Sequence, residues 1–271
     1  MDPIAKTAHY CCGARAADAE RADPICGDHL ARRFMNDEAR AIFARFSRFT
    51  NANASNVTRH RLIDDWLRER LTATPDLRVV LLGAGFDTRA FRLHGGRWVE
   101  LDQPETIAIK EAELPEAEAP NALRRVAIDF AVDSLADKLK PFAGESPVVV
   151  VMEGVNAYVG QAETRRTLDI LIRTFPRHAL ICDLLSARFV RRYSGELRRQ
   201  IEDLGGRFAE LADDPARTFV EAGYRQLAQV SIIDRARELG AISVPRWLLN
   251  TLLRTLRDGY RAYIFEAPPS R

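Results

Sequence analysis

The chain has 271 residues, of which 46% are hydrophobic, so it is long enough and apolar enough to bury a core as one large domain. Its 40 lysines and arginines nearly balance its 38 acidic residues, and a net charge of +2 gives no reason to expect a nucleic acid or an anionic membrane as partner. No positively charged and then apolar leader begins the chain, and no apolar run approaches the roughly 20 residues of a membrane-spanning helix. We therefore expect a cytoplasmic protein.

The spacing of the cysteines and histidines does not indicate a metal site. The four cysteines are Cys11, Cys12, Cys26 and Cys182, and their spacing matches no zinc or redox motif. The five histidines form no close pair on one face of a helix. We expect reduced, structural cysteines and no bound metal.

The first 75 residues have the pattern of helices rather than strands. Apolar side chains recur near helical spacing over 30–46 and again over 63–71. The polar segment 51–56 between them is predicted to be a loop that separates two helices. We interpret 1–75 as an amino-terminal helical lid on the rest of the chain.

Short apolar runs and segments of helix length alternate after residue 75. The runs lie at 77–82, 97–101, 124–128, 147–152 and 179–185. Alternation of this kind predicts an α/β fold with a doubly wound, mostly parallel sheet. The segment 76–185 is the predicted core.

An amphipathic stretch follows the fifth run. Its apolar residues from Phe189 to Leu211 repeat every three or four positions, and its arginines lie mostly off that stripe. A minimal sheet has no place for this stretch, so we expect 186–217 to form a helical cap at the carboxyl edge of the sheet. The remainder, 218–271, is predicted to complete a seven-stranded sheet: a strand ends near Ile233, a helix spans 246–257 and a last strand spans 260–265.

The segment VVLLGAGFDTR at 79–89 carries the strongest functional signal. Gly83 and Gly85 come directly after a buried strand, where glycine lets the backbone turn sharply and approach a ligand closely. Asp102 ends the next predicted strand, and an acid at that point can accept hydrogen bonds from both hydroxyls of a ribose. The combination predicts a cofactor that contains adenosine, although the two glycines alone also fit an ordinary turn between strand and helix.

This loop departs from the dinucleotide fingerprint Gly-x-Gly-x-x-Gly. Thr88 stands at the third glycine position, and Asp87 adds negative charge where a pyrophosphate would need the positive end of a helix. An acidic loop is better suited to a cofactor with a positive or neutral region, such as the methionine part of S-adenosylmethionine. A nicotinamide dehydrogenase is therefore the weakest alternative.

Short motifs in a fixed order extend this interpretation along most of the chain. They are KTA at 6–8, RHR at 59–61, GAGFDTR at 83–89, ELDQP at 100–104, DF at 129–130 and EGV at 153–155. Together they resemble the leucine carboxyl methyltransferase family of class I S-adenosylmethionine-dependent methyltransferases, including its bacterial O-methyltransferases of polyketide biosynthesis. The resemblance implies a Rossmann-like fold, and it makes 76–185 the cofactor-binding core.

The resemblance also implies which residues bind S-adenosylmethionine. Gly83 and Gly85 lie under its methionine part, and Asp102, followed by Gln103, holds the ribose hydroxyls. Asp129 accepts a hydrogen bond from the adenine amino group and Phe130 lies against the ring, although an isolated Asp at such a point is more often a helix cap.

Three charged residues are implied to hold the amino-acid end of the cofactor. Glu153 ends an apolar strand, where a carboxylate needs a partner, and the ammonium of the cofactor would supply one. Arg59 resembles the family arginine that pairs with the cofactor carboxylate, and Lys6 in the lid resembles a lysine with a similar task. Surface cations are the alternative interpretation of the last two.

The chemistry that follows is methyl transfer to oxygen without a metal. A sulfonium activates its own methyl group, so the protein must chiefly orient a nucleophile and exclude water. A carboxylate attacks unaided, whereas a hydroxyl requires a base. The family and the absence of a His–Asp signature favour the carboxylate of a small molecule, in polyketide or other secondary metabolism. His9 and His60 are the candidate bases for a hydroxyl acceptor, and Arg192 and Tyr193 are candidate acceptor contacts.

Three alternatives remain open at this point. The enzyme class could use S-adenosylmethionine for other chemistry, such as attack on its alkyl chain or cyclisation. The acceptor could be the carboxyl terminus of a protein. The chain could also bind the cofactor as an interaction module without turnover.

Overall fold

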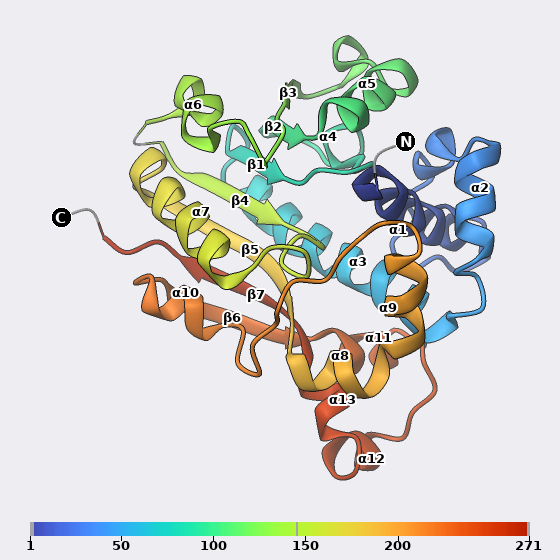
Figure 1. Cartoon of the computed structure of the whole chain (residues 1–271). Coiled ribbons are helices and arrows are strands. Elements are labelled where there is room, and N and C mark those ends of the chain that lie inside the picture. Colours follow the sequence, from blue (N-terminus) through green and yellow to red (C-terminus); the bar gives the residue numbers. More distant parts are fainter. Residues whose placement is uncertain (1–2, 145, 270–271) are drawn as a thin grey trace.

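A seven-stranded sheet forms the centre of the computed structural model, which describes residues 3–144 and 146–269 (Figure 1). The strand order is β3-β2-β1-β4-β5-β7-β6, and β7 runs antiparallel to its neighbours β5 and β6. The predicted doubly wound, mostly parallel α/β sheet is thus confirmed. The strands are β1 (Arg78–Leu82), β2 (Arg97–Asp102), β3 (Ala122–Ala127), β4 (Val148–Met152), β5 (His178–Leu185), β6 (Arg225–Ser231) and β7 (Tyr260–Glu266).

Helices cover both faces of this sheet and one of its edges (Figure 1). The α-helices are α1 (Pro3–Ala19), α2 (Asp37–Ala44), α3 (Thr50–Ala73), α4 (Arg89–Arg92), α5 (Pro104–Glu113), α6 (Leu135–Leu139), α7 (Gln161–Thr174), α8 (Ala187–Tyr193), α9 (Gly195–Glu202), α10 (Arg217–Glu221), α11 (Ile232–Glu238), α12 (Arg246–Asn250) and α13 (Arg254–Asp258). Three short 3-10 helices are η1 (Ala31–Phe34), η2 (Glu116–Glu118) and η3 (Lys140–Phe142).

The central strands are buried on both faces because alternate side chains point to opposite helix layers. On one face, Val80 and Val150 share a buried cluster with Leu168 of α7. On the other face, Val149 shares a buried cluster with Leu67 of α3. Burial of apolar area on both faces stabilises the strands by about 25 cal/mol per Å². Because both faces are buried, each central strand is a continuous apolar run in the sequence.

The order of the strands places a topological switch point between β1 and β4. From β1 the sheet grows through β2 and β3 in one direction and through β4 and β5 in the other. Connections from the carboxyl ends of β1 and β4 therefore leave the sheet in opposite directions and open a crevice between them, where ligands of such sheets bind. Gly83 follows β1 and Glu153 follows β4 at this edge.

The predicted loop at 51–56 is wrong, because this segment lies inside the long helix α3. Two of its polar side chains bond to nearby backbone: the Asn53 amide donates to Phe46 O in the preceding turn at 3.0 Å, and the Ser55 hydroxyl donates to Asn51 O inside the helix at 2.9 Å. The loop comes earlier, at 45–49. Asn53 thus bonds to the turn that precedes its own helix and does not form a separate loop.

Two more predicted boundaries differ in the carboxyl-terminal half. The strand predicted to end near Ile233 ends at Ser231, because the Ser231 side chain accepts a hydrogen bond from Asp234 N and starts α11. The helix predicted over 246–257 is two short helices, α12 and α13, separated by the turn at 251–253. In the predicted cap at 186–217, α8 and α9 are helical, whereas 203–216 is irregular.

The amino-terminal helices and the segment after β5 pack against each other at the carboxyl edge (Figure 1). Tyr10 of α1, Ile42 of α2 and Ile201 of α9 belong to one buried cluster, and Tyr158 of the loop after β4 packs against it. The segments predicted as lid (1–75) and cap (186–217) are therefore held together by apolar packing, while their roles stay predictions. Among the described residues, no helix combines the length and the apolar character that crossing a bilayer requires.

Candidate active site at the carboxyl edge of the sheet

The loop after β1 is shaped by two glycines in the left-handed region of the backbone. Gly83 has φ +70° and Gly85 has φ +47°, which residues with a Cβ rarely adopt. A Cβ at Gly83 would lie 2.6 Å from Cγ2 of Val155, in the loop after β4. The amides of Gly83 and Ala84 both donate to Leu101 O of β2, at 2.9 and 3.0 Å. The loop is thus fixed between β2 and β4 at the switch point.

Asp102, the last residue of β2, ties this loop down from the other side. Its carboxylate is 3% exposed; Oδ2 accepts from Gly85 N at 2.6 Å and Oδ1 accepts from Gln103 N at 2.7 Å. Burial raises the pKa of Asp102, and these two hydrogen bonds offset only part of that rise. A carboxylate has about four lone-pair positions, so Asp102 can accept hydrogen bonds beyond those from Gly85 N and Gln103 N.

Asp129 and Phe130 follow β3 on the same edge. Asp129 Oδ1 accepts from Ala131 N at 2.9 Å, which is the local capping bond expected of an isolated aspartate in a turn. The side chain of Phe130 is 44% exposed, unusually open for an aromatic residue beside a core. Their assignment to the adenine ring stays a prediction.

Glu153, the first residue after β4, is surrounded by nitrogen atoms of two arginines and a histidine. Oε1 lies 3.0 Å from Arg59 Nε, and Oε2 lies 2.7 Å from Arg89 Nη1 and 3.3 Å from His60 Nδ1. Burial alone would raise the pKa of Glu153, but Arg89, His60 and Arg59 hold it well below its usual value. The partner expected for the Glu153 carboxylate is therefore supplied by the protein itself. A cofactor ammonium would share this carboxylate with two guanidinium groups.

Arg59 projects from α3 and contacts residues on β5, on β7 and directly after β4. It is 8% exposed, and besides Glu153 its Nη1 donates to Asp183 Oδ2 at 3.2 Å and to the Tyr260 hydroxyl at 2.8 Å. Asp183 in turn accepts from Gly154 N through its other oxygen, at 2.6 Å. Arg59 is thus a fixed element of the site, and its predicted pairing with a cofactor carboxylate would have to use a guanidinium that already has partners.

Sequence reasoning missed Arg89 and Asp183 as members of this network. Arg89 begins α4 and is fully buried; Nε lies 2.5 Å from Asp64 Oδ1, and Nη1 also donates to Asp87. Asp183 lies within the apolar strand β5 and is 4% exposed. Two features of the sequence could have indicated them: Arg89 comes directly after the glycine loop, and Asp183 interrupts an apolar run. A charged side chain at either position requires a buried partner.

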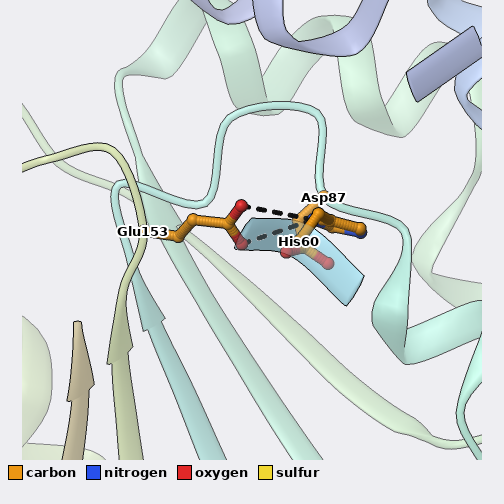
Figure 2. A group of neighbouring side chains, drawn as sticks. All are labelled: His60, Asp87 and Glu153. Atoms are coloured by element: carbon orange, nitrogen blue, oxygen red, sulfur yellow. Dashed lines mark hydrogen bonds and ion pairs between the residues drawn. The ribbon is translucent and has the colours of Figure 1, made fainter. Parts of the chain in front are cut away.

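His60 occupies the centre of the network, next to a group of potential metal ligands. Ligand atoms of His60, Asp87 and Glu153 lie within 4.8 Å of one another, and Figure 2 shows Glu153 pointing toward the other two. The carboxylates of Asp87 and Glu153 are, however, both bound by Arg89. Burial and Arg89 lower the pKa of His60. The cluster therefore has the chemistry of an ion-pair network, with a guanidinium where a metal would need to be.

Comparison with known proteins identifies the family. The family model for leucine carboxyl methyltransferase matches residues 8–172, which include the glycine loop, Asp102 and Glu153. The chain belongs to the leucine carboxyl methyltransferase family. The family expected from the sequence motifs is confirmed, and the protein is an enzyme, a methyltransferase of class EC 2.1.1.

Relatives of this methyltransferase come from actinobacteria. The chain is 28% identical to the tetracenomycin polyketide synthesis O-methyltransferase TcmP of Streptomyces glaucescens, over 87% of this chain and 85% of that protein. It is 30% identical to a protein of Parafrankia sp., provisionally named an S-adenosyl-L-methionine-dependent methyltransferase, over 63% of this chain and 59% of that protein.

The solved structures similar to this methyltransferase share its fold. A crystal structure of a DUF574 family protein from Streptomyces avermitilis covers 94% of this chain and 97% of its own, with a TM-score of 0.57 at 14% identity. An O-methyltransferase family protein from Burkholderia thailandensis covers 99% of this chain and 72% of its own, with a TM-score of 0.51 at 15% identity.

The remaining candidate residues of the methyltransferase lie on the lid and the cap. Lys6 is half-buried on α1, three residues before His9, which is fully buried. Arg192 is exposed on α8, with its Cζ 5.6 Å from the ring of Tyr193, and lines an open surface hollow of about 260 Å³. Tyr193 is half-buried and packs in the cluster that contains Tyr260, the hydroxyl partner of Arg59. All four assignments stay predictions.

Proposed function

We propose that this methyltransferase transfers the methyl group of S-adenosylmethionine to an oxygen atom of a small acid, in secondary metabolism. One observation carries the proposal: the loop with Gly83 and Gly85 is bound by the Asp102 carboxylate at the switch point between β1 and β4. The methyl donor is S-adenosylmethionine, which is part of the name of the relative from Parafrankia sp.. The name of TcmP supports oxygen as the accepting atom and a polyketide context.

The residues at this edge fit the proposed cofactor. Gly83 and Gly85 leave the backbone of the loop free of side chains, so a ligand can approach it closely. Asp102 has lone pairs left for a ribose diol. Phe130 offers an exposed aromatic face on the adjoining loop, where an adenine ring would bury apolar area.

When bound, the cofactor supplies a methyl group that its sulfonium already makes electrophilic. The task of the protein is then to position the acceptor and to exclude water. The packed lid and cap would exclude water, since Tyr10 of α1 and Ile201 of α9 share one buried apolar cluster. Glu153 at the end of β4 is shared by Arg59 and Arg89, and a cofactor ammonium would be a third cation on the same carboxylate.

A carboxylate acceptor is favoured because His60 is not a free base. Its Nδ1 lies 2.9 Å from Arg89 Nη2, and its Nε2 lies 2.8 Å from Arg92 Nη2. Protonation of this ring would add a cation between two guanidinium groups. A carboxylate needs no base, because it is already ionised at neutral pH.

Calorimetric titration with S-adenosylhomocysteine tests the cofactor pose. Asp102→Asn should weaken binding about 10-fold or more, since hydrogen bonds to a charged carboxylate contribute about 1.5–3 kcal/mol. Asp76→Ala is the matched control, because Asp76 is an exposed acid just before β1, at the opposite end of the sheet. Equal affinity of wild type and Asp102→Asn would refute the pose.

Turnover products separate the proposed reaction from its alternatives. Incubation with S-adenosylmethionine and a panel of small carboxylic and phenolic acids should yield S-adenosylhomocysteine and a methyl ester. Release of methylthioadenosine would instead indicate attack on the alkyl chain. A methylated phenol without any ester would move the acceptor from carboxylate to hydroxyl and leave the cofactor assignment intact.

A further inference from the structure

His9 on α1 is buried against the glycine loop. Its side chain is 0% exposed, and its ring centroid lies 4.3 Å from that of Phe86, which directly follows Gly85. The preceding residue, Ala8, has its Cβ 3.5 Å from the position that a Cβ on Gly85 would take. Helix α1 thus lies directly on the loop that the proposed function assigns to the cofactor.

Both ring nitrogens of His9 lack a hydrogen-bond partner among the described residues. Burial lowers the pKa of His9 to about 4, and the charges of Glu38 and Glu105 offset only part of this shift. The ring is therefore neutral at pH 7, with one nitrogen a donor and the other an acceptor. A buried polar group without a partner destabilises the fold, which a purely structural position would avoid with an apolar side chain.

The surroundings of His9 connect it with the residues around Asp102. Glu105, whose charge acts on the ring, lies in the first turn of α5, directly after Asp102 and Gln103. Phe86 belongs to the loop after β1. The ring of His9 therefore lies against the loop whose Gly85 N donates to the Asp102 carboxylate. A neutral imidazole complements a hydroxyl, because each has one donor and can accept.

We propose that His9 binds the ribose of the cofactor from the lid, opposite Asp102, so that its ring nitrogens gain hydrogen-bond partners when the cofactor binds. This inference rests on the proposed function. The inference adds a residue of α1 to the cofactor site. Cofactor binding would then favour the arrangement in which α1 packs on the glycine loop. His9 is thus a binding residue, with no part in proton transfer.

Two substitutions of His9 test this inference by calorimetry with S-adenosylhomocysteine. His9→Phe keeps an aromatic ring against Phe86 but removes both nitrogens, and its affinity should fall between about 5-fold and 100-fold. His9→Gln retains a donor and an acceptor and should recover part of the loss. His94→Phe, at an exposed position, is the matched control and should bind like wild type.

Thermal unfolding without ligand distinguishes a binding role from a structural one. The ligand-free His9→Phe variant should melt at or above the wild-type temperature, because it no longer buries unpaired nitrogens. Adenosine as a second probe should lose affinity for His9→Phe by the same factor as S-adenosylhomocysteine. If His9→Phe fails to fold, the ¹⁵N shifts of the wild-type His9 ring, followed by NMR during titration with S-adenosylhomocysteine, report the same contact.

Several results would overturn the inference. Equal affinity of His9→Phe and wild type, or unchanged ¹⁵N shifts at saturation, excludes a contact with the ligand. If His9→Phe melts at a lower temperature and binds more weakly than wild type, and His9→Gln does not recover the binding, then His9 has a structural role. Loss of affinity for S-adenosylhomocysteine but not for adenosine moves the contact away from the ribose. If wild type itself does not bind S-adenosylhomocysteine, the proposed function fails, and the inference with it.

Discussion

Arg89→Met should destabilise the protein strongly, because Arg89 holds together the ion-pair network beneath the glycine loop. The guanidinium is fully buried and pairs with Asp64, Asp87 and Glu153. Methionine has similar length but no charge, so the variant leaves three carboxylates without their shared cation. Breaking one buried pair by removing a partner costs about 3–5 kcal/mol. We therefore expect Arg89→Met to lower the free energy of unfolding by at least about 3 kcal/mol. That is a large share of the roughly 5–15 kcal/mol that a domain has.

The pH dependence of this loss has a definite sign. Arg89, with other cations, holds the pKa values of Asp64 and Glu153 below their usual range, against the effect of burial. Depressed carboxyl pKa values stabilise the fold above the unfolded pKa of about 4, and this stabilisation is lost as the pH falls further. The difference between wild type and Arg89→Met should therefore be largest at pH 7 and should narrow below pH 4.

Urea unfolding followed by far-UV circular dichroism measures both effects. The matched control is Arg166→Met, because Arg166 pairs with Glu163 at 2.7 Å on the surface of α7, where their side chains are 72% and 56% exposed. Exposed pairs contribute about 0–1 kcal/mol, so the control should stay within that range. A loss below 1 kcal/mol for Arg89→Met, or a difference that stays constant down to pH 3, would refute the reasoning.

Further predictions concern the loop, the core and the lid. Gly83→Ala should lower the free energy of unfolding by about 1–3 kcal/mol and weaken binding of S-adenosylhomocysteine, because its φ of +70° and the contact at Val155 exclude a Cβ. Gly160→Ala, with open space around it, should change neither quantity. Denaturant titration measures the stability, and calorimetry measures the binding. Leu168→Ala should lower the free energy of unfolding by about 2–5 kcal/mol in urea, since this side chain is 0% exposed. The pKa of His9 is lowered to about 4 in the folded protein, against 6.5 when unfolded. Between pH 6.5 and pH 4, wild type should therefore lose on the order of 3 kcal/mol more unfolding free energy than His9→Phe. Parallel curves of unfolding free energy against pH for the two proteins would contradict this.

The sheet could be predicted from sequence because its strands are buried on both faces. Runs such as Val148–Met152 are continuously apolar, and their order along the chain implies parallel pairing. The segment 51–56 was misjudged because asparagine is typical of turns, whereas here Asn53 bonds to the backbone that precedes its own helix. Local sequence does not distinguish these two uses of one side chain.

The candidate site was predictable only where a short motif marks it. Gly83, Gly85 and Asp102 lie within motifs whose spacing has a physical reason, and the structure brings them together. The partners of Arg59 could not be read in the same way, because Asp183 lies 124 positions away and Tyr260 lies 201 positions away in the chain. Such pairs are set by the order of the strands rather than by any local pattern.

A crystal structure of the chain grown with saturating S-adenosylhomocysteine tests the central claim most directly. The account predicts density in the crevice between β1 and β4, with the ribose hydroxyls on Asp102 and the sulfur above the loop of Gly83 and Gly85. Density for the ligand at any other place, with Asp102 still bonded only to Gly85 and Gln103, would contradict the account.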